Sequence, residues 1–88
     1  MTITPAVLSQ LPLPDVRSVT FYKRDEITTD LIFCDVDVGG SVWTFHEEAN
    51  GWTDLIRHLS ALPGFRADWH EAVVSPPFAP SVIVAFQL

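Results

Sequence analysis

The 88-residue chain is predicted to adopt an α+β fold: a curled antiparallel sheet of about four strands, in the order β-β-β-α-β, with one main helix packed on one face. Three observations lead to this prediction. Residues 16–47 alternate between apolar and polar side chains around a Gly39-Gly40 turn, residues 51–62 follow a helical period, and residues 82–86 are apolar throughout. Consecutive strands joined by a short turn pair in antiparallel fashion, whereas parallel strands need a long crossover.

We expect a single domain over residues 1–88, because a chain of this length supports one small core. Residues 1–15 are predicted to form an extended arm, since they contain Pro5, Pro12 and Pro14. The arm also contains apolar residues, namely Ile3, Val7, Leu8, Leu11 and Leu13. It is therefore expected to pack either on its own domain or on a partner, while residues 16–88 form the α+β body.

Residues 16–23 are predicted to form the first strand, followed by a polar connection over residues 24–26. Side chains of a strand alternate between its two faces. One face of this strand then carries Val19, Phe21 and Lys23, and the other carries Thr20 and Tyr22.

Residues 31–38 and 41–47 are predicted to form a hairpin, because both positions of a tight two-residue turn favour glycine, and Gly39-Gly40 supplies them. The turn sets the register of the two strands. One face receives the pairs Ile32 with Glu47, Cys34 with Phe45, and Val36 with Trp43. The other receives Phe33 with His46, Asp35 with Thr44, and Asp37 with Val42. The first face is largely apolar and the second is mixed, so the pattern agrees with the register.

Residues 51–62 are predicted to form the main helix, with Asn50 as its N-cap and Pro63-Gly64 at its end. The apolar residues at helical spacing are Trp52, Leu55, Ile56, Leu59 and Leu62. This single stripe is expected to pack on the hairpin face that carries Cys34 and Phe45.

A short second helix is predicted over residues 65–74, followed by an extended connection over residues 75–80. Residues 82–86 are apolar at every position, which predicts a strand buried on both faces: central in the sheet, or covered by a partner. The sheet face opposite the helix carries Leu31, Phe33 and Val42, which makes it too apolar to be left in water. We expect the arm or a second copy of the protein to cover it.

Eleven acidic against five basic residues give a net charge of −6, which disfavours nucleic acid and anionic membranes as partners. No apolar run approaches the roughly 20 residues of a membrane span. The N-terminus lacks the basic residues of a secretory signal. The single cysteine, Cys34, fits a reducing cytoplasm, where we expect the protein to reside. No cofactor is expected.

His46, Asp35 and Glu48 are the candidate ligand-binding or metal-binding residues. His46 and Glu47 point to opposite faces of their strand, so they do not share a metal. His46 approaches Asp35 diagonally across the hairpin at roughly 7 Å between Cβ atoms. Histidine and carboxylate groups bind divalent metals or act as general bases, although this spacing matches no established ligand motif. The sequence predicts no catalytic residue.

Two further groups are interpreted as structural. Cys34 lies on the apolar hairpin face, where burial makes a thiol inert. Within the run from Asp68 to Glu71, consecutive helical residues point in different directions, so His70 is not expected to form a site with its neighbours. Trp69 is expected to anchor this segment to the core.

Several short pieces form a distinctive pattern: Trp43 with His46-Glu47-Glu48, Gly51-Trp52, Leu62-Pro63-Gly64-Phe65, Trp69, and Pro76-Pro77-Phe78-Ala79. On this pattern, residues 28–79 resemble a small family of uncharacterised bacterial proteins. The resemblance implies no catalytic residue and no cofactor. The strand-rich half followed by a helix is also similar to bacterial pleckstrin-like domains, which end on a helix where this chain is predicted to end on a strand.

The sequence favours a non-enzymatic module that self-associates, as a homodimer, or binds another protein. The apolar arm, the half-apolar second sheet face and the apolar final strand lead to this expectation. The alternative is a small-ligand or metal-binding protein, or an enzyme, that uses a histidine-carboxylate site near His46.

Overall fold

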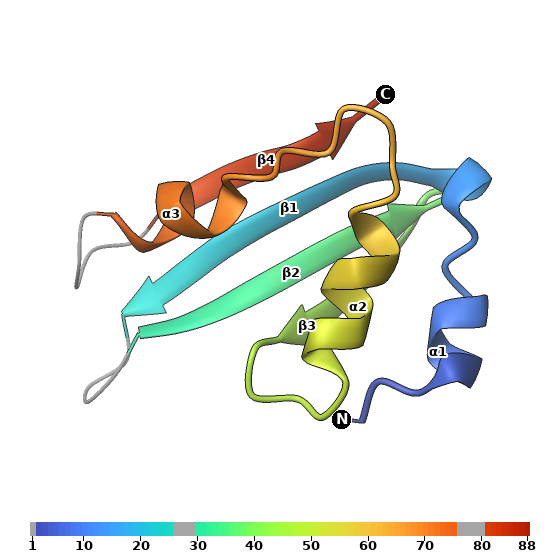
Figure 1. Cartoon of the computed structure of the whole chain (residues 1–88), viewed down its shortest axis with the longest axis horizontal. Helices are drawn as coiled ribbons and strands as arrows, with labels where there is room; N and C mark the ends of the chain where they lie inside the picture. Colours follow the sequence, from blue (N-terminus) through green and yellow to red (C-terminus); the bar gives the residue numbers. More distant parts are fainter. Residues whose placement is uncertain (1, 26–29, 76–80) are drawn as a thin grey trace.

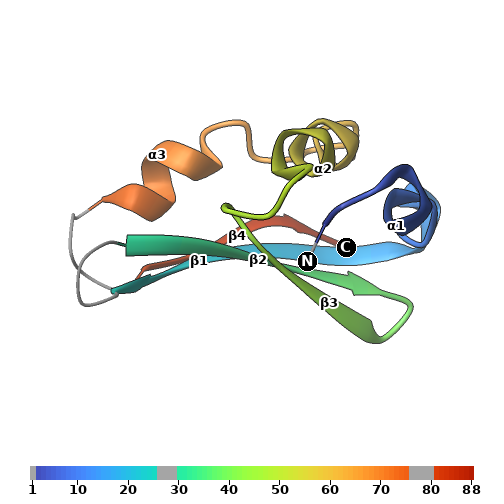
Figure 2. The same ribbon diagram turned by 90° about the horizontal axis from the view of Figure 1, so that it is seen from below.

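The computed structural model describes residues 2–25, 30–75 and 81–88, and it has the predicted α+β fold. Its four strands form one open antiparallel sheet in the order β3-β2-β1-β4 (Figure 1). The strands are β1 (Val16–Asp25), β2 (Asp30–Val38), β3 (Ser41–His46) and β4 (Ser81–Gln87). The strong right-handed twist typical of small sheets turns β3 away from the plane of the other strands (Figure 2).

The described helices are α1 (Pro5–Ser9), α2 (Trp52–Leu59), α3 (Trp69–Val74) and the single 3-10 turn η1 (Leu13–Asp15). The three α-helices lie on the same face of the sheet, which is the inner face of the molecule (Figure 2). None of the described helices is long and apolar enough to cross a membrane. The fold therefore has two layers, with helices on one side of the sheet only.

The β2–β3 hairpin has the predicted register. Val38 pairs with Ser41, Cys34 with Phe45, and Phe33 with His46. Gly39 and Gly40 have φ of 60° and 97°, the left-handed values that a two-residue hairpin turn of this kind requires. Beyond the last pair, the Glu47 amide donates to the Ile32 carbonyl at 3.0 Å. The Ile32 amide in turn donates to Oε1 of Glu47 at 3.1 Å. The Glu47 side chain thus takes the place of a backbone acceptor at the end of the ladder.

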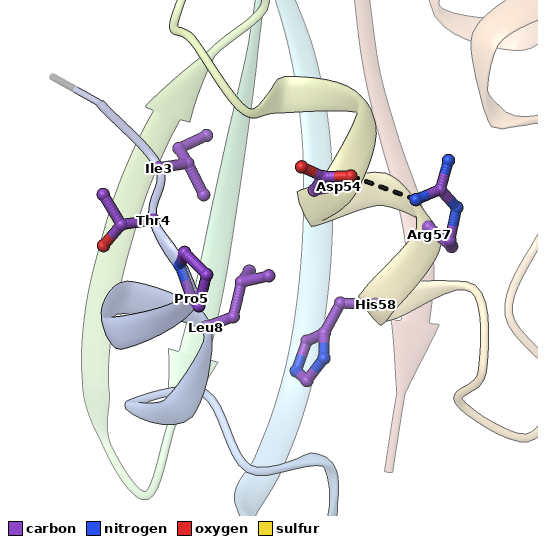
Figure 3. Close-up of a pocket in the computed structure, with 7 residues that line it drawn as sticks. All are labelled: Ile3, Thr4, Pro5, Leu8, Asp54, Arg57 and His58. Atoms are coloured by element: carbon purple, nitrogen blue, oxygen red, sulfur yellow. Dashed lines mark hydrogen bonds and ion pairs between the residues drawn. The ribbon is translucent and has the colours of Figure 1, made fainter.

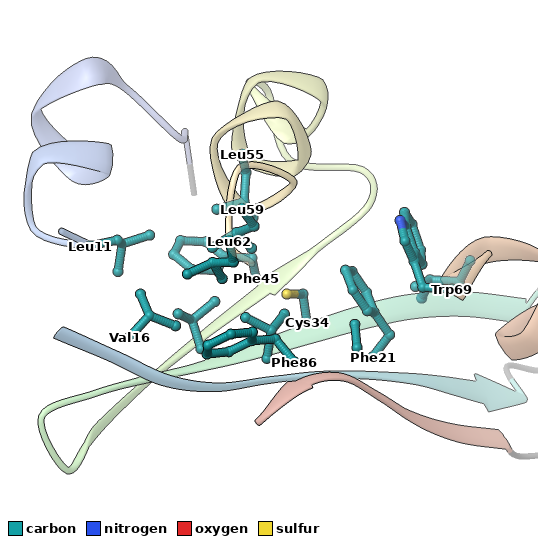
Figure 4. Packing of buried hydrophobic residues seen from close by; sticks show 14 of the residues in the cluster. Leu11, Val16, Phe21, Cys34, Phe45, Leu55, Leu59, Leu62, Trp69 and Phe86 are labelled. Carbon is teal, nitrogen blue, oxygen red and sulfur yellow. The ribbon is translucent and has the colours of Figure 1, made fainter. Parts of the chain in front are cut away.

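The core fills the space between the helices and the inner sheet face (Figure 4). Leu55 and Leu59 of α2 are fully buried, as are Cys34 and Phe45 beneath them. This arrangement confirms that the apolar stripe of the helix packs on the predicted hairpin face. Within the stripe Leu62 is also buried, whereas Trp52 and Ile56 are only partly buried.

The Trp69 indole anchors α3, as predicted. Its ring stacks on Phe21 of β1 at 3.9 Å between centroids and 12° between planes. The C-terminus of α3 is held by β1 as well, because Nζ of the buried Lys23 donates to the Val74 carbonyl at 2.9 Å. A cation is favourable at this end of a helix, where the carbonyls lack partners.

The predicted limits of both helices were too wide. The main helix begins at Trp52 and ends at Leu59, and Gly51, not Asn50, is its N-cap. Asn50 is used elsewhere, since its carbonyl accepts the Ile3 amide at 2.7 Å. The second helix covers only Trp69–Val74 of the predicted residues 65–74. Apart from Ser75, the predicted extended connection lies outside the described residues.

The prediction that the arm is extended throughout was wrong. Residues 5–9 form α1, because Pro5 suits the first helical turn and the Thr4 hydroxyl accepts the Val7 amide at 3.2 Å. The arm packs on its own domain, which was one of the two expected alternatives, because Ile3 and Leu11 are buried in the same core as α2. It lies on the inner face of the sheet and not on the outer one.

Of the two alternatives for the final strand, the central position was wrong, and coverage by a partner stays a prediction. β4 is an edge strand that pairs with β1 alone, and β1 is central between β4 and β2. Ala85 and Phe86 are buried in the core, whereas Val82 is 67% exposed and Val84 is 48% exposed. The apolar run therefore reflects one buried face and one uncovered apolar face.

Candidate functional site

The outer face of the sheet is the side that carries no helix, and it is the candidate functional surface. Within the described residues, no element packs over it (Figure 2). Its side chains belong to the residues that alternate with the buried ones: Ser18, Thr20, Tyr22 and Arg24 of β1, Leu31, Phe33, Asp35 and Asp37 of β2, Val42, Thr44 and His46 of β3, and Val82 and Val84 of β4. Leu31, Phe33 and Val42 lie on this face among polar residues, as predicted, but the arm does not cover it.

An aromatic row crosses the outer face. The rings of Tyr22 and Phe33, which are partners in the β1–β2 ladder, stack at 5.3 Å between centroids and 9° between planes. The Arg24 guanidinium lies 4.9 Å from the Phe33 centroid and 5.8 Å from the Tyr22 centroid. His46 approaches Phe33 edge-on at 6.2 Å. Aromatic and arginine side chains held in this way lose little entropy on binding, which is why they are common at the centres of protein interfaces.

Asp35 lies beside the aromatic row and is held by two hydroxyl groups. Its Oδ1 accepts hydrogen bonds from the Thr44 hydroxyl at 2.8 Å and from the Tyr22 hydroxyl at 3.3 Å. The pKa of Tyr22 is raised, because its hydroxyl is partly removed from water and the Asp35 carboxylate disfavours a phenolate. Tyr22 therefore stays a neutral donor, and Asp35 is fixed by both neighbouring strands.

His46 and Glu48, the other two candidate residues, are held by their own turn. Nδ1 of His46 accepts the Glu48 amide at 3.3 Å. The ladder partner of His46 is Phe33, whereas that of Asp35 is Thr44. Within the part of the chain that the structure describes, no three histidine, cysteine or acidic side chains gather as a metal site would require.

Cys34 is buried in the core, as predicted. Its pKa is strongly raised, because the apolar surroundings disfavour the thiolate and the neighbouring Asp35 adds a negative charge. The thiol is consequently unreactive in the folded protein.

A cavity of about 290 Å³ lies on the opposite side of the molecule, between the arm and α2 (Figure 3). The polar side chains on its α2 wall are already engaged. Nε2 of His58 donates to the Leu11 carbonyl at 2.7 Å, and Arg57 pairs with Asp54 at 3.0 Å. The first contact joins the arm to α2, and the second lies on the surface of α2. We therefore interpret the cavity as a gap between packed elements and not as a binding site.

Each edge of the sheet has one backbone carbonyl that is bonded from outside the ladder. At the β4 edge, the Arg66 amide donates to the Ala85 carbonyl at 2.8 Å, where β4 is irregular. At the β3 edge, the Ala49 amide donates to the His46 carbonyl at 3.0 Å, whereas no described residue donates such a bond to Val42 or Thr44. Val42 is 60% exposed.

Comparisons of the chain with protein-family models, curated proteins and solved structures returned no match. The function is therefore argued from the surface itself.

The aromatic row was missed by sequence reasoning. The alternation in residues 16–23 placed Tyr22 on the correct face, but nothing in the connection after Arg24 sets the register between β1 and β2. A turn signal like Gly39-Gly40 would have brought Tyr22 opposite Phe33. In its absence, the stack depends on long-range strand pairing.

Proposed function

We propose that this protein is a non-enzymatic interaction module that associates with a second copy of itself through the uncovered side of its sheet. One observation carries the proposal: every described α-helix lies on the inner face, so no described element covers the outer face (Figure 2). Small sheets with one apolar face are stabilised when a second layer or strand covers that face or edge.

The surface chemistry supports binding more than catalysis. Val42, Val82 and Val84 present apolar surface, and the aromatic row is rigid before any partner arrives. The ionisable group nearest the row, Asp35, already accepts two hydroxyl hydrogen bonds. Because Asp35 already has hydrogen-bond donors within its own chain, it can lie at the rim of an interface without becoming an unpaired charge.

Light scattering coupled to size-exclusion chromatography, at several concentrations in the micromolar range, tests the proposal. We expect a dimer that dissociates on dilution, and a chain that is strictly monomeric at all concentrations would contradict it. Val42→Asp adds a charge to the bare side and should shift the equilibrium to monomer. Ala61→Asp adds the same charge on the exposed helical side and should leave the dimer unchanged.

A further inference from the structure

We propose that the cavity between α2 and α3 binds a small planar aromatic carboxylate. The two helices are neighbours in the helix layer, on the inner side of the sheet, so the inference does not depend on self-association through the outer face (Figure 2). The cavity has a volume of about 350 Å³. Small-molecule sites span roughly 300–1,000 Å³, so this cavity suits a ligand at the small end of the range.

Two tryptophans give the cavity its aromatic walls. The ring centroids of Trp52 on α2 and Trp69 on α3 lie 6.3 Å apart, with 72° between the ring planes. Trp69 is held in place by its stack on Phe21, whereas Trp52 and the adjacent Ile56 are only partly buried. A flat aromatic ring that enters the cavity therefore meets apolar surface and ring edges, in the arrangements that aromatic groups prefer.

The Trp69 indole is a buried hydrogen-bond donor without a partner. The residue is only 8% exposed, and its Nε1 donates no hydrogen bond within the part of the chain that the structure describes. A buried indole N–H ordinarily finds an acceptor, because leaving a buried polar group unpaired is unfavourable. Figure 4 shows the nitrogen at the end of the ring that lies farther from the sheet, in the helix layer that contains the cavity. The unpartnered N–H points to a ligand that brings an acceptor.

The polar groups of the lining favour an anionic acceptor. Arg57 carries a fixed positive charge, and none of the described acidic side chains lines this cavity. The Arg57 pair with Asp54 at 3.0 Å is exposed, so it is weak and leaves the guanidinium able to bind a ligand. His70, which the sequence analysis interpreted as structural, lies edge-to-face against Trp69 at 5.4 Å between centroids. A carboxylate accepts hydrogen bonds from an indole N–H and from a cationic group at the same time.

Nuclear magnetic resonance of the isotope-labelled full chain tests the site, with cinnamate as the probe. Each of the three tryptophans gives its own indole N–H signal. We expect the Trp69 signal to shift and saturate, and the signal of Trp43, which lies on β3, to stay in place. The expected Kd is about 0.1–1 mM, because the probe is small and the net charge of −6 opposes an anion at long range.

Cinnamyl alcohol tests the charge of the ligand. It keeps the planar ring of cinnamate but has a hydroxyl group in place of the carboxylate. We expect it to bind at least about tenfold more weakly, since charge-assisted hydrogen bonds are lost. Equal affinity for the two probes would overturn the assignment of an anionic ligand.

Trp69→Phe tests the donor. The substitution removes the indole N–H and keeps an aromatic ring against Phe21. We expect the affinity for cinnamate to fall by about tenfold or more, as the loss of a hydrogen bond to a charged group predicts. Trp43→Phe makes the same change outside the cavity and should leave the affinity unchanged. An unchanged Kd in a folded Trp69→Phe variant would overturn the role of the donor.

The parent chain decides the question even if Trp69→Phe fails to fold. A Trp69 signal that does not shift at about 10 mM cinnamate, tenfold above the highest expected Kd, would overturn the site. Equal movement of all three indole signals would overturn it as well, because it indicates contact without a defined place. Light scattering of the parent chain tests the proposed function separately, so either proposal can fail while the other stands.

Discussion

The Arg66 amide donates a 2.8 Å hydrogen bond to the Ala85 carbonyl and joins the segment before α3 to the edge of β4. The contact fixes the connection between α2 and α3, which lies in the helix layer above the sheet in Figure 2, to the last strand. At the other edge of the sheet, the Ala49 amide makes the corresponding bond to the His46 carbonyl at 3.0 Å.

Replacing Arg66 with proline should weaken the attachment of the segment before α3 to β4. Proline lacks the amide that holds Ala85, so a neutral hydrogen bond worth about 1 kcal/mol is lost from the free energy of unfolding. We expect urea unfolding to detect this loss. Arg66→Ala is the control, because it removes only the exposed ion pair with Asp68 and keeps the amide. An equal loss in both variants would contradict the role of the backbone contact.

Replacing Gly51 with alanine should destabilise the fold through the arm. Gly51 has φ of 91°, and an added Cβ would overlap the carbonyl of Ile3. We expect the free energy of unfolding, measured in urea, to fall by more than about 2 kcal/mol, since backbone strain and the displaced arm act together. Gly64→Ala has a similar positive φ with open space around the Cβ, so its loss should be about 1 kcal/mol. Equal losses would show that the contact with Ile3 is unimportant.

Truncating Trp69 should release α3 from the sheet. The indole is only 8% exposed and stacks on Phe21, so Trp69→Ala is expected to cost about 3–5 kcal/mol of unfolding free energy. Trp43→Ala removes an equally large side chain that is only partly buried, and its cost should be clearly smaller. Urea unfolding followed by circular dichroism compares the two. A larger loss for Trp43 would contradict the assignment of Trp69 as the anchor.

The stability of the protein should fall at alkaline pH because of Cys34. Burial raises the pKa of the folded thiol above that of the unfolded chain, which is about 8.5. Below that value both states are protonated and the contribution of Cys34 is fully present. Above it the unfolded state alone loses a proton, so stability declines by at most about 1.4 kcal/mol per pH unit.

Urea unfolding at pH values from about 7.5 to 9.5, on either side of the ordinary thiol pKa, measures this slope. Cys34→Ala should be less stable at neutral pH, since it leaves a small cavity, but its stability should decline less steeply with pH. Identical slopes in the two proteins would contradict the assignment to Cys34.

The hairpin and the main helix could be predicted because their information is local. Gly39-Gly40 sets the β2–β3 register through the geometry of one turn, and the side-chain period of two then assigns every hairpin residue to a face. The stripe from Trp52 to Leu62 identified the helix and its buried side in the same way. The N-terminal limit of the main helix was less accurate, because Gly51, with φ of 91°, takes the N-cap position.

For the candidate site, the sequence predicted which residues share a face of the hairpin, but not how they contact the neighbouring strand. It placed His46, Asp35 and Thr44 on one side of the hairpin, as the structure has them. It did not supply the contacts of Asp35 with Tyr22, nor the stack of Tyr22 on Phe33, because these join β1 to β2 across a connection without a turn signal.

Periodicity and turn chemistry, which act over a few residues, thus determined the elements, the hairpin register and the division of the sheet into a buried face and a mixed outer face. Only the tertiary structure decided that β1 is central, that β4 is an edge covered by Arg66, and that the arm packs with the helices. The apolar run 82–86 illustrates the reason. Its composition shows that neither face of the strand carries a charged side chain. The order of the strands depends instead on which distant strands pair with each other, and no local pattern determines that pairing.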